Sequence, residues 1–226
     1  FILELLQIAS QAMLHLSRFA EDFIYLSSTP VGWIELPDYL CTGSSMMPQK
    51  KNPDLLELTR GKTASVLGHA SAIASLIKGL PTSYHRDLQQ DKEHLFSAVD
   101  MVAGTLDVIP LVVSDFKVNQ KRVEKALRQG FLMATDLAEY LVTREVPFRE
   151  AHQRVGKLVA YCVDEGLTLE QVPLEKLQEF APECGPEVSE VLRFESFLKR
   201  RWHKGSPGLV SIEGQIAEWH KKIKEL

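Results

Sequence analysis

Three long stretches with the apolar period of an α-helix constrain the fold of this chain more than any other feature. Across residues 1–26, apolar side chains recur every three or four positions, which gathers them on one side of a helix. A second stretch runs from Pro53 to about Lys78, and a third continues past about residue 87 to Val113, with Pro110 as a possible kink. Helices of this length, each roughly 35–40 Å long, bury their apolar sides against one another. The pattern therefore predicts a multi-helix bundle.

The second stretch carries small residues that suit close packing between helices. Glycine costs about 1 kcal/mol in a helix interior, so two of them indicate that neighbouring backbones approach closely. The small positions of this stretch are Gly61, Ala64, Ser65, Gly68, Ala72 and Ser75.

The character of the sequence changes after Asp115, where shorter amphipathic segments begin. Asn119 and Thr135 suit helix starts, Pro147 suits a first turn, and Gly166 suits a stop. No alternation of β-branched residues bounded by hairpin turns occurs. We therefore predict an all-α chain with two parts, a long-helix bundle over residues 1–116 and a smaller C-terminal helical domain over residues 117–226.

Composition excludes several classes of protein. The chain is 45% hydrophobic with a net charge of −4, so we expect a soluble globular protein that binds no nucleic acid. The basic cluster at residues 199–204 is interpreted as a solvated helix end, and no apolar run predicts a membrane span. Three widely spaced cysteines, with no metal-ligand spacing, predict a reducing cytoplasm and no metal or cofactor.

One long connector, residues 31–53, carries more chemistry than a simple connection needs. It ends in Gly43-Ser-Ser-Met-Met-Pro-Gln-Lys-Lys-Asn-Pro53, followed by Asp54. Asn52 is predicted to cap the next helix, with Pro53 at its first position. The helix N-terminus, the ammonium groups of Lys50 and Lys51 and the hydroxyls of Ser44 and Ser45 would then together suit a carboxylate or a carbanion conjugated to one.

This string resembles the signature loop of the fumarase/aspartase superfamily, and its variable positions resemble the argininosuccinate lyase branch, which includes delta-crystallin. The similarity continues through residues 16–23, 80–92, 134–141 and 147–152. Because Phe1 opens within an amphipathic helix and the family's chains are about twice as long, we expect the C-terminal half of such a lyase.

The resemblance implies a reaction and an assembly. The family removes a proton beside a carboxylate of a succinyl group and then breaks the adjacent carbon–nitrogen bond, which for this branch splits argininosuccinate into arginine and fumarate. Such a reaction belongs to arginine biosynthesis or the urea cycle. The resemblance also implies a homotetramer, whose central bundle comes from four subunits and whose active sites form where three subunits meet.

The resemblance assigns roles residue by residue. Ser44 matches the position of the catalytic serine, although Ser45 could act equally well on chemistry alone. Lys50 matches a residue that stabilises the developing charge, whereas Lys51 points elsewhere. Glu57 matches a carboxylate that pairs with a catalytic histidine in the absent half, and a first-turn surface role is the alternative.

Four further positions match substrate-binding residues of the family. Asn52 is the first, and Tyr84, Gln89 and Lys92 follow a second connector. A phenol, an amide and an ammonium can together hold carboxylates and the amino-acid end of a ligand.

The alternatives are a sister lyase such as one for adenylosuccinate, a structural crystallin with the same fold, and an oligomerisation module. An enzyme is favoured over either structural role, because a structural role gives no reason to keep all six of these residue types: Ser44, Lys50, Asn52, Tyr84, Gln89 and Lys92.

Overall fold

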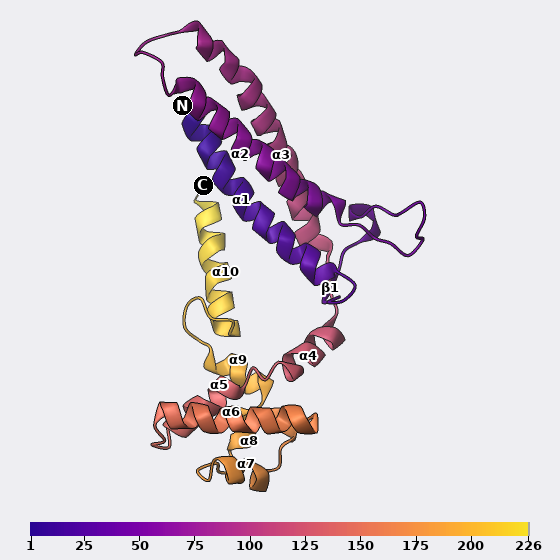
Figure 1. The fold of residues 1–226 in the computed structure, drawn as a ribbon, viewed down its shortest axis with the longest axis vertical. Coiled ribbons are helices and arrows are strands. Elements are labelled where there is room, and N and C mark those ends of the chain that lie inside the picture. Colours follow the sequence, from indigo (N-terminus) through magenta and orange to yellow (C-terminus); the bar gives the residue numbers. More distant parts are fainter. Residues whose placement is uncertain (226) are drawn as a thin grey trace. The chain divides into compact units, whose positions relative to one another are not determined.

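The computed structural model describes residues 1–225, apart from the side chain of Gln129, and divides into two compact units. Unit 1 is Phe1–Val123, and unit 2 is Glu124–Leu226. Figure 1 shows the three long helices of unit 1 running side by side. The elements of unit 1 are α1 (Ile2–Ser27), β1 (Ile34–Glu35), η1 (Asp38–Leu40), α2 (Asp54–Ile77), η2 (Arg86–Gln90), α3 (Asp91–Asp115) and β2 (Lys117–Val118).

The long helices of unit 1 pack through the apolar sides that their period predicts. One buried cluster joins all three helices, and a second buries the residues beside η1 and the start of α2. The hydroxyl of Thr63 on α2 also donates to the carbonyl of Met13 on α1 at 3.1 Å. The buried members of the two clusters are Leu6, Met13, Val66, Ile73, Ala98, Ala20, Leu36, Leu40, Leu56 and Val112.

Two short strands tie the connectors of unit 1 together. β1 pairs antiparallel with β2, with Ile34 opposite Val118. The Asn119 amide donates to the carbonyl of Trp33 at 2.8 Å, and Arg122 reaches the carbonyl of Thr29 at 3.1 Å. These bonds hold residues 117–123 to unit 1, so the division follows residue 123, within α4, rather than residue 116.

Unit 2 is built from shorter helices around α6. Gly166 ends α6 in the left-handed conformation with φ of 66°, as the sequence predicts. Thr135 is not a helix cap, since α5 begins one residue earlier, at Ala134. The helices are α4 (Gln120–Gln129), which begins in unit 1, then α5 (Ala134–Val142), α6 (Phe148–Glu165), η3 (Leu169–Gln171), α7 (Leu174–Phe180), α8 (Val188–Val191), α9 (Phe194–Arg200) and α10 (Leu209–Lys224).

The basic cluster at the end of α9 is not simply solvated. Arg200 donates to the Asp136 carboxylate at 2.8 and 3.1 Å, and Arg201 donates to its other oxygen at 2.9 Å. Asp136 lies on α5 and its side chain is only 1% exposed. The solvated interpretation was therefore wrong for these two arginines, because a buried carboxylate 64 residues away in sequence recruits them.

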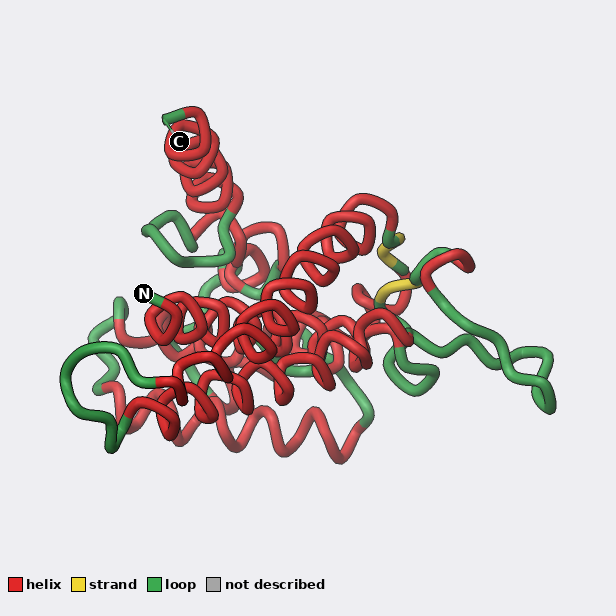
Figure 2. Tube along the Cα trace, turned by 90° about the horizontal axis from the view of Figure 1, so that it is seen from above, coloured by secondary structure: helices red, strands yellow, loops and turns green. Residues whose placement is uncertain are grey.

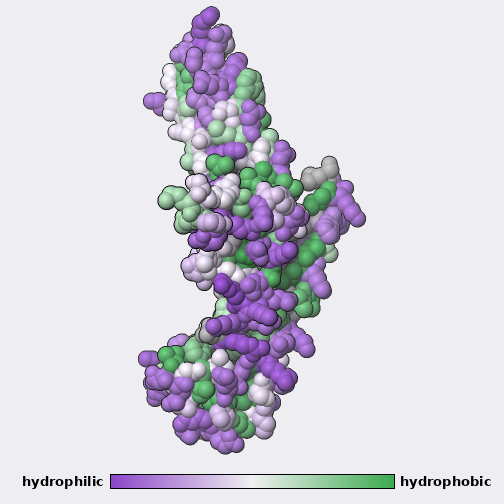
Figure 3. Space-filling model, turned by 90° about the vertical axis from the view of Figure 1, so that its right-hand side faces the viewer, coloured by the Kyte–Doolittle hydropathy of each residue, from purple (hydrophilic) through white to green (hydrophobic). Residues whose placement is uncertain are grey.

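Two helices leave apolar stripes exposed. On α3, six of the exposed residues with apolar side chains recur at the spacing of a coiled-coil seam: Phe96, Val99, Ala103, Leu106, Pro110 and Val113. On α10 a similar exposed stripe comprises Leu209, Ile212, Ile216, Trp219 and Ile223. Figure 3 shows apolar residues at the surface of the arm that α10 forms.

The segment Arg86–Asp115, which comprises η2 and α3, is long and apolar enough to cross a membrane by length and composition. The apolar runs of the sequence, taken alone, predict no such segment. Apolar residues cover both the side of α3 packed on α1 and α2 and its exposed side, which raises the apolar content of the whole segment.

Candidate functional site

The signature loop, residues 43–51, is closed at its neck by main-chain hydrogen bonds. The amide of Thr42 donates to the carbonyl of Asn52 at 3.0 Å, and the Asn52 amide returns a bond at 2.8 Å. The Thr42 hydroxyl also donates to the carboxylate of Asp54 at the start of α2. Figure 2 shows the loop extending beyond the helices beside the two short strands.

Ser44 lies just inside the neck with its hydroxyl oxygen turned toward the loop backbone. The amides of Met46 and Met47 donate to its Oγ at 3.2 and 3.3 Å. Hydrogen bonds donated to an oxygen favour its negatively charged form. The loop therefore directs two amide dipoles at the Ser44 oxygen, which would favour negative charge there, a feature that the residue types alone do not reveal.

The two lysines at the end of the loop point in different directions. The amide of Lys50 closes a turn on the carbonyl of Met47 at 3.0 Å, and its side chain is exposed. Among the described residues, the Lys50 ammonium makes no ion pair. Lys51 instead donates to the carbonyl of Leu36, away from the loop. Glu57 lies exposed in the first turn of α2.

Asn52 does not cap α2, contrary to the sequence prediction. The helix begins at Asp54, and its cap position is Pro53, with no side-chain cap bond. The Asn52 backbone is held in the neck, while its side-chain amide donates to the carbonyl of Gly43 at 3.4 Å. Asn52 instead pairs with Thr42 in an antiparallel β-bridge. Its backbone is therefore committed to the neck of the loop, and the helix starts later, at Asp54.

The second group of predicted site residues lies around the connector from α2 to α3. Gln89 in η2 donates to the phenol oxygen of Tyr84 at 3.2 Å, and Lys92 in the first turn of α3 pairs with Asp91 at 2.7 Å. Ser83, just before, has φ of 94° in the left-handed region, a conformation that turns the connector sharply. Tyr84, Gln89 and Lys92 are all exposed.

The two groups lie at opposite ends of α2 (Figure 1). The signature loop precedes the helix and the Tyr84 connector follows it. Because α2 has 24 residues, it separates the groups by about 36 Å. One copy of unit 1 therefore cannot place Ser44 and Tyr84 on the same small substrate.

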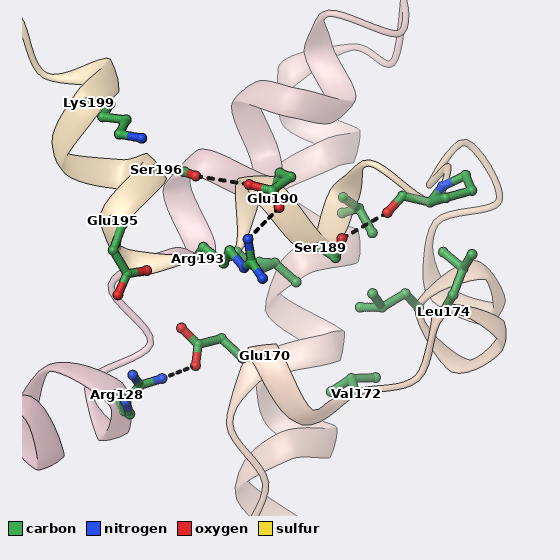
Figure 4. A pocket seen from close by; sticks show the side chains of 14 residues that line it. Arg128, Glu170, Val172, Leu174, Ser189, Glu190, Arg193, Glu195, Ser196 and Lys199 are labelled. Atoms are coloured by element: carbon green, nitrogen blue, oxygen red, sulfur yellow. Dashed lines mark hydrogen bonds and ion pairs between the residues drawn. The ribbon is translucent and has the colours of Figure 1, made fainter.

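A separate cavity lies in unit 2. Its volume is about 640 Å³, and none of the predicted site residues lines it. Figure 4 shows that its charged rim is largely paired with itself, as Arg128 contacts Glu170 and Arg193 contacts Glu190. Within residues 1–225, no three metal-ligating side chains come together.

Comparisons with known proteins match the chain to the same family that its signature loop resembles. A family model described as "Argininosuccinate lyase C-terminal" matches residues 131–199, and one described as "Lyase" matches residues 1–68. The argininosuccinate lyase of Staphylococcus carnosus is 45% identical over 216 residues, which are 96% of this chain and 47% of that protein. That of Caldicellulosiruptor bescii is 44% identical over 226 residues, 100% of this chain and 49% of that protein. The chain thus spans about half the length of these relatives.

Solved structures support the fold. EDDS lyase in complex with formate superposes with a TM-score of 0.90 at 23% identity, over 99% of this chain and 46% of that one. The 3-carboxy-cis,cis-muconate lactonizing enzyme of Pseudomonas putida gives a TM-score of 0.70 at 22% identity, over 84% and 43% of the two chains. These likenesses show the fold alone, whereas the matched family models and the relatives at 42–45% identity place the chain in the argininosuccinate lyase branch of the fumarase/aspartase superfamily.

Proposed function

We propose that the full-length protein containing this chain is a carbon–nitrogen lyase that splits argininosuccinate into arginine and fumarate, in arginine biosynthesis or the urea cycle. The observation that carries the proposal is the arrangement at Ser44, whose Oγ accepts two main-chain hydrogen bonds within a loop that also presents Lys50. The identity of 42–45% to argininosuccinate lyases supports the choice of substrate.

The loop suits the difficult step of such an elimination. Ser44, as an alkoxide, takes the proton from the carbon beside a substrate carboxylate, which leaves a carbanion. Its electron pair then forms the double bond of fumarate as the carbon–nitrogen bond breaks and the leaving nitrogen takes a proton. Lys50 stabilises the negative charge that spreads into the carboxylate before the bond breaks. Asn52, Tyr84, Gln89 and Lys92 bind substrate, and Glu57 orients the family's histidine.

The separation of the two groups supports an assembly in which subunits share active sites. A second copy lying antiparallel to the first would bring its Tyr84 connector beside the Ser44 loop, since the groups occupy opposite ends of α2. The exposed α3 stripe, with Phe96 and Leu106 among its members, has the spacing needed to pack against such copies. We infer a cytoplasmic homotetramer built on this stripe. The free thiols of the three cysteines are consistent with a reducing compartment.

The activity is tested in the full-length protein with Ser44→Ala, by following the absorbance of fumarate after addition of argininosuccinate. We expect activity in the parent and its collapse in the variant while the oligomer stays intact. Ser45→Ala is the matched control, because Ser45 is exposed and, within residues 1–225, no main-chain amide donates to its hydroxyl as two do to that of Ser44. An inactive parent would refute the proposed reaction, and an active Ser44→Ala variant would remove Ser44 from the mechanism.

Sharing of sites is tested by mixing two inactive variants, Ser44→Ala and Lys92→Met, and allowing the subunits to exchange. If each site draws the two groups from different subunits, some sites in mixed oligomers contain neither substitution and regain activity. Mixed oligomers that stay inactive, when each variant alone forms the normal assembly, would contradict shared sites.

A further inference from the structure

Lys51 lies in sequence between Lys50 and Asn52 but makes its contacts outside the loop. Its Nζ donates to the carbonyl of Leu36 at 2.8 Å. The same ammonium forms an ion pair with Asp38 at 2.7 Å and a longer one with Glu35 at 3.6 Å. Lys51 thus joins the end of the signature loop to three consecutive features of the preceding chain: β1, Leu36 and η1.

The main-chain acceptor of Lys51 belongs to a well-packed part of unit 1, while the side chains of Asp38 and Glu35 are 94% and 74% exposed. Leu36 is 5% exposed and Leu40 is 4% exposed, and both pack with Leu56 of α2 in the same buried cluster. β1 is in turn paired with β2. Lys51 therefore fastens the loop to a backbone segment that the core holds through Leu36 and Leu40.

The ammonium of Lys51 stays charged under ordinary assay conditions. Its hydrogen bond to Asp38 raises the pKa of Lys51, and the same bond lowers the pKa of Asp38. Both groups are ionised across the neutral range, so the ion pair persists there.

Apart from the neck bonds between Thr42 and Asn52, and the bond from the Asn52 side chain to the carbonyl of Gly43, the other hydrogen bonds of the signature loop are internal to it. The bonds of Ser44 with Met46 and Met47, and the turn that Lys50 closes, all lie within the loop. Met46 is 88% exposed. Among the described residues, Lys51 is the one side chain of the loop that forms a hydrogen bond or ion pair with the body of unit 1.

We propose that Lys51 is a positioning residue, which anchors the signature loop to the β1–η1 segment and so holds Lys50 and Ser44 in one arrangement. This inference rests on the proposed function and deepens it. Lys51 itself does not touch the substrate. It acts by limiting where its two catalytic neighbours lie, and a displacement of about 1 Å in such groups can cost roughly a hundredfold in rate.

The first test compares Lys51→Met with Lys51→Arg in the full-length protein. We expect kcat/KM to fall roughly ten- to hundredfold in Lys51→Met, mainly through kcat, because the charge that Lys50 stabilises develops on the way to the transition state. Lys51→Arg should recover most of this loss, since a guanidinium can reach both the carbonyl and the carboxylate. Lys121→Met, an exposed lysine of α4, serves as the control and should keep full activity.

A double-substitution cycle identifies the contact responsible. Asp38→Asn should reproduce part of the Lys51→Met effect, and the combined variant should be no worse than Lys51→Met alone, because both changes break one ion pair. Glu35→Gln should have a smaller effect, since its oxygen is farther from Nζ. Independent, multiplying losses from Asp38→Asn and Lys51→Met would overturn the anchor.

A second readout does not depend on the reaction. Hydrogen exchange at the amides of residues 43–50 should accelerate in Lys51→Met while exchange in α1 and α3 stays unchanged. Unchanged loop exchange, or a lower unfolding temperature with unchanged kcat/KM, would overturn the inference. An inactive parent would refute the proposed reaction alone, and the exchange measurement would still decide the role of Lys51.

Discussion

Replacing Asp136 with alanine should destabilise unit 2 by about 3 kcal/mol. Its carboxylate accepts three hydrogen bonds from Arg200 and Arg201, which fasten α9 to α5. The side chain of Asp136 is only 1% exposed, so water cannot replace these partners. Alanine would leave two guanidinium groups facing a site that no longer carries a negative charge.

The magnitude follows from how far each partner is buried. Breaking a buried ion pair costs about 3–5 kcal/mol, chiefly because a charge is left uncompensated. The side chains of Arg200 and Arg201 are 37% and 22% exposed, so each recovers part of its hydration once Asp136 is gone. This recovery favours the lower end of the range. Asp136→Asn keeps one acceptor oxygen and should cost less than Asp136→Ala.

Hydrogen exchange in unit 2 measures the loss directly. A destabilisation of about 3 kcal/mol should accelerate exchange of the most protected amides of α5 and α6 by roughly a hundredfold. Asp164→Ala is the matched control, because Asp164 is exposed on α6 and should change stability by less than about 0.5 kcal/mol. If Asp136→Ala exchanges no faster than Asp164→Ala, the buried carboxylate does not hold α9, and the reasoning fails.

Three further predictions concern unit 2. Leu158→Ala should cost about 2–5 kcal/mol in urea denaturation, because Leu158 is 2% exposed within the core. Gly166→Ala should cost about 1–2 kcal/mol in the same assay, since φ of 66° disfavours a Cβ. Glu218, whose pKa is lowered to about 2 by hydrogen bonds from Lys204 and Lys222, should stay ionised as pH falls below 4.5 in an NMR titration. Its stabilising effect should be lost progressively as pH falls from about 4.5 to about 2, whereas an ordinary folded-state midpoint near 4.5 would refute the pairing.

Local sequence signals predicted much of the fold. The three- and four-residue spacing placed α1, α2 and α3, because side chains that share one side of a helix are neighbours whatever the rest of the chain does. Gly166 marked the end of α6 for an equally local reason, and Asn119 accepts a bond from the amide of Arg122, as a cap should.

Predictions that depend on distant partners were wrong. Asn52 has the residue type of a helix cap, but its pairing with Thr42, ten residues earlier, takes its backbone into extended conformation. Arg200 looked solvated because its partner Asp136 lies in another helix. In both cases a non-local contact overrides the local preference.

The sequence by itself determined the helical content and the position of the signature loop, because period and residue type are carried by neighbours along the chain, and its resemblance to a known family singled out Ser44 and Lys50 as candidate residues within that loop. Only the tertiary structure decided how these residues are supported. It folds the loop backbone so that two amides meet the Ser44 hydroxyl and ties Lys51 to the β1–η1 segment. It also places Tyr84 a whole helix away from Ser44, because α2 is rigid and about 36 Å long.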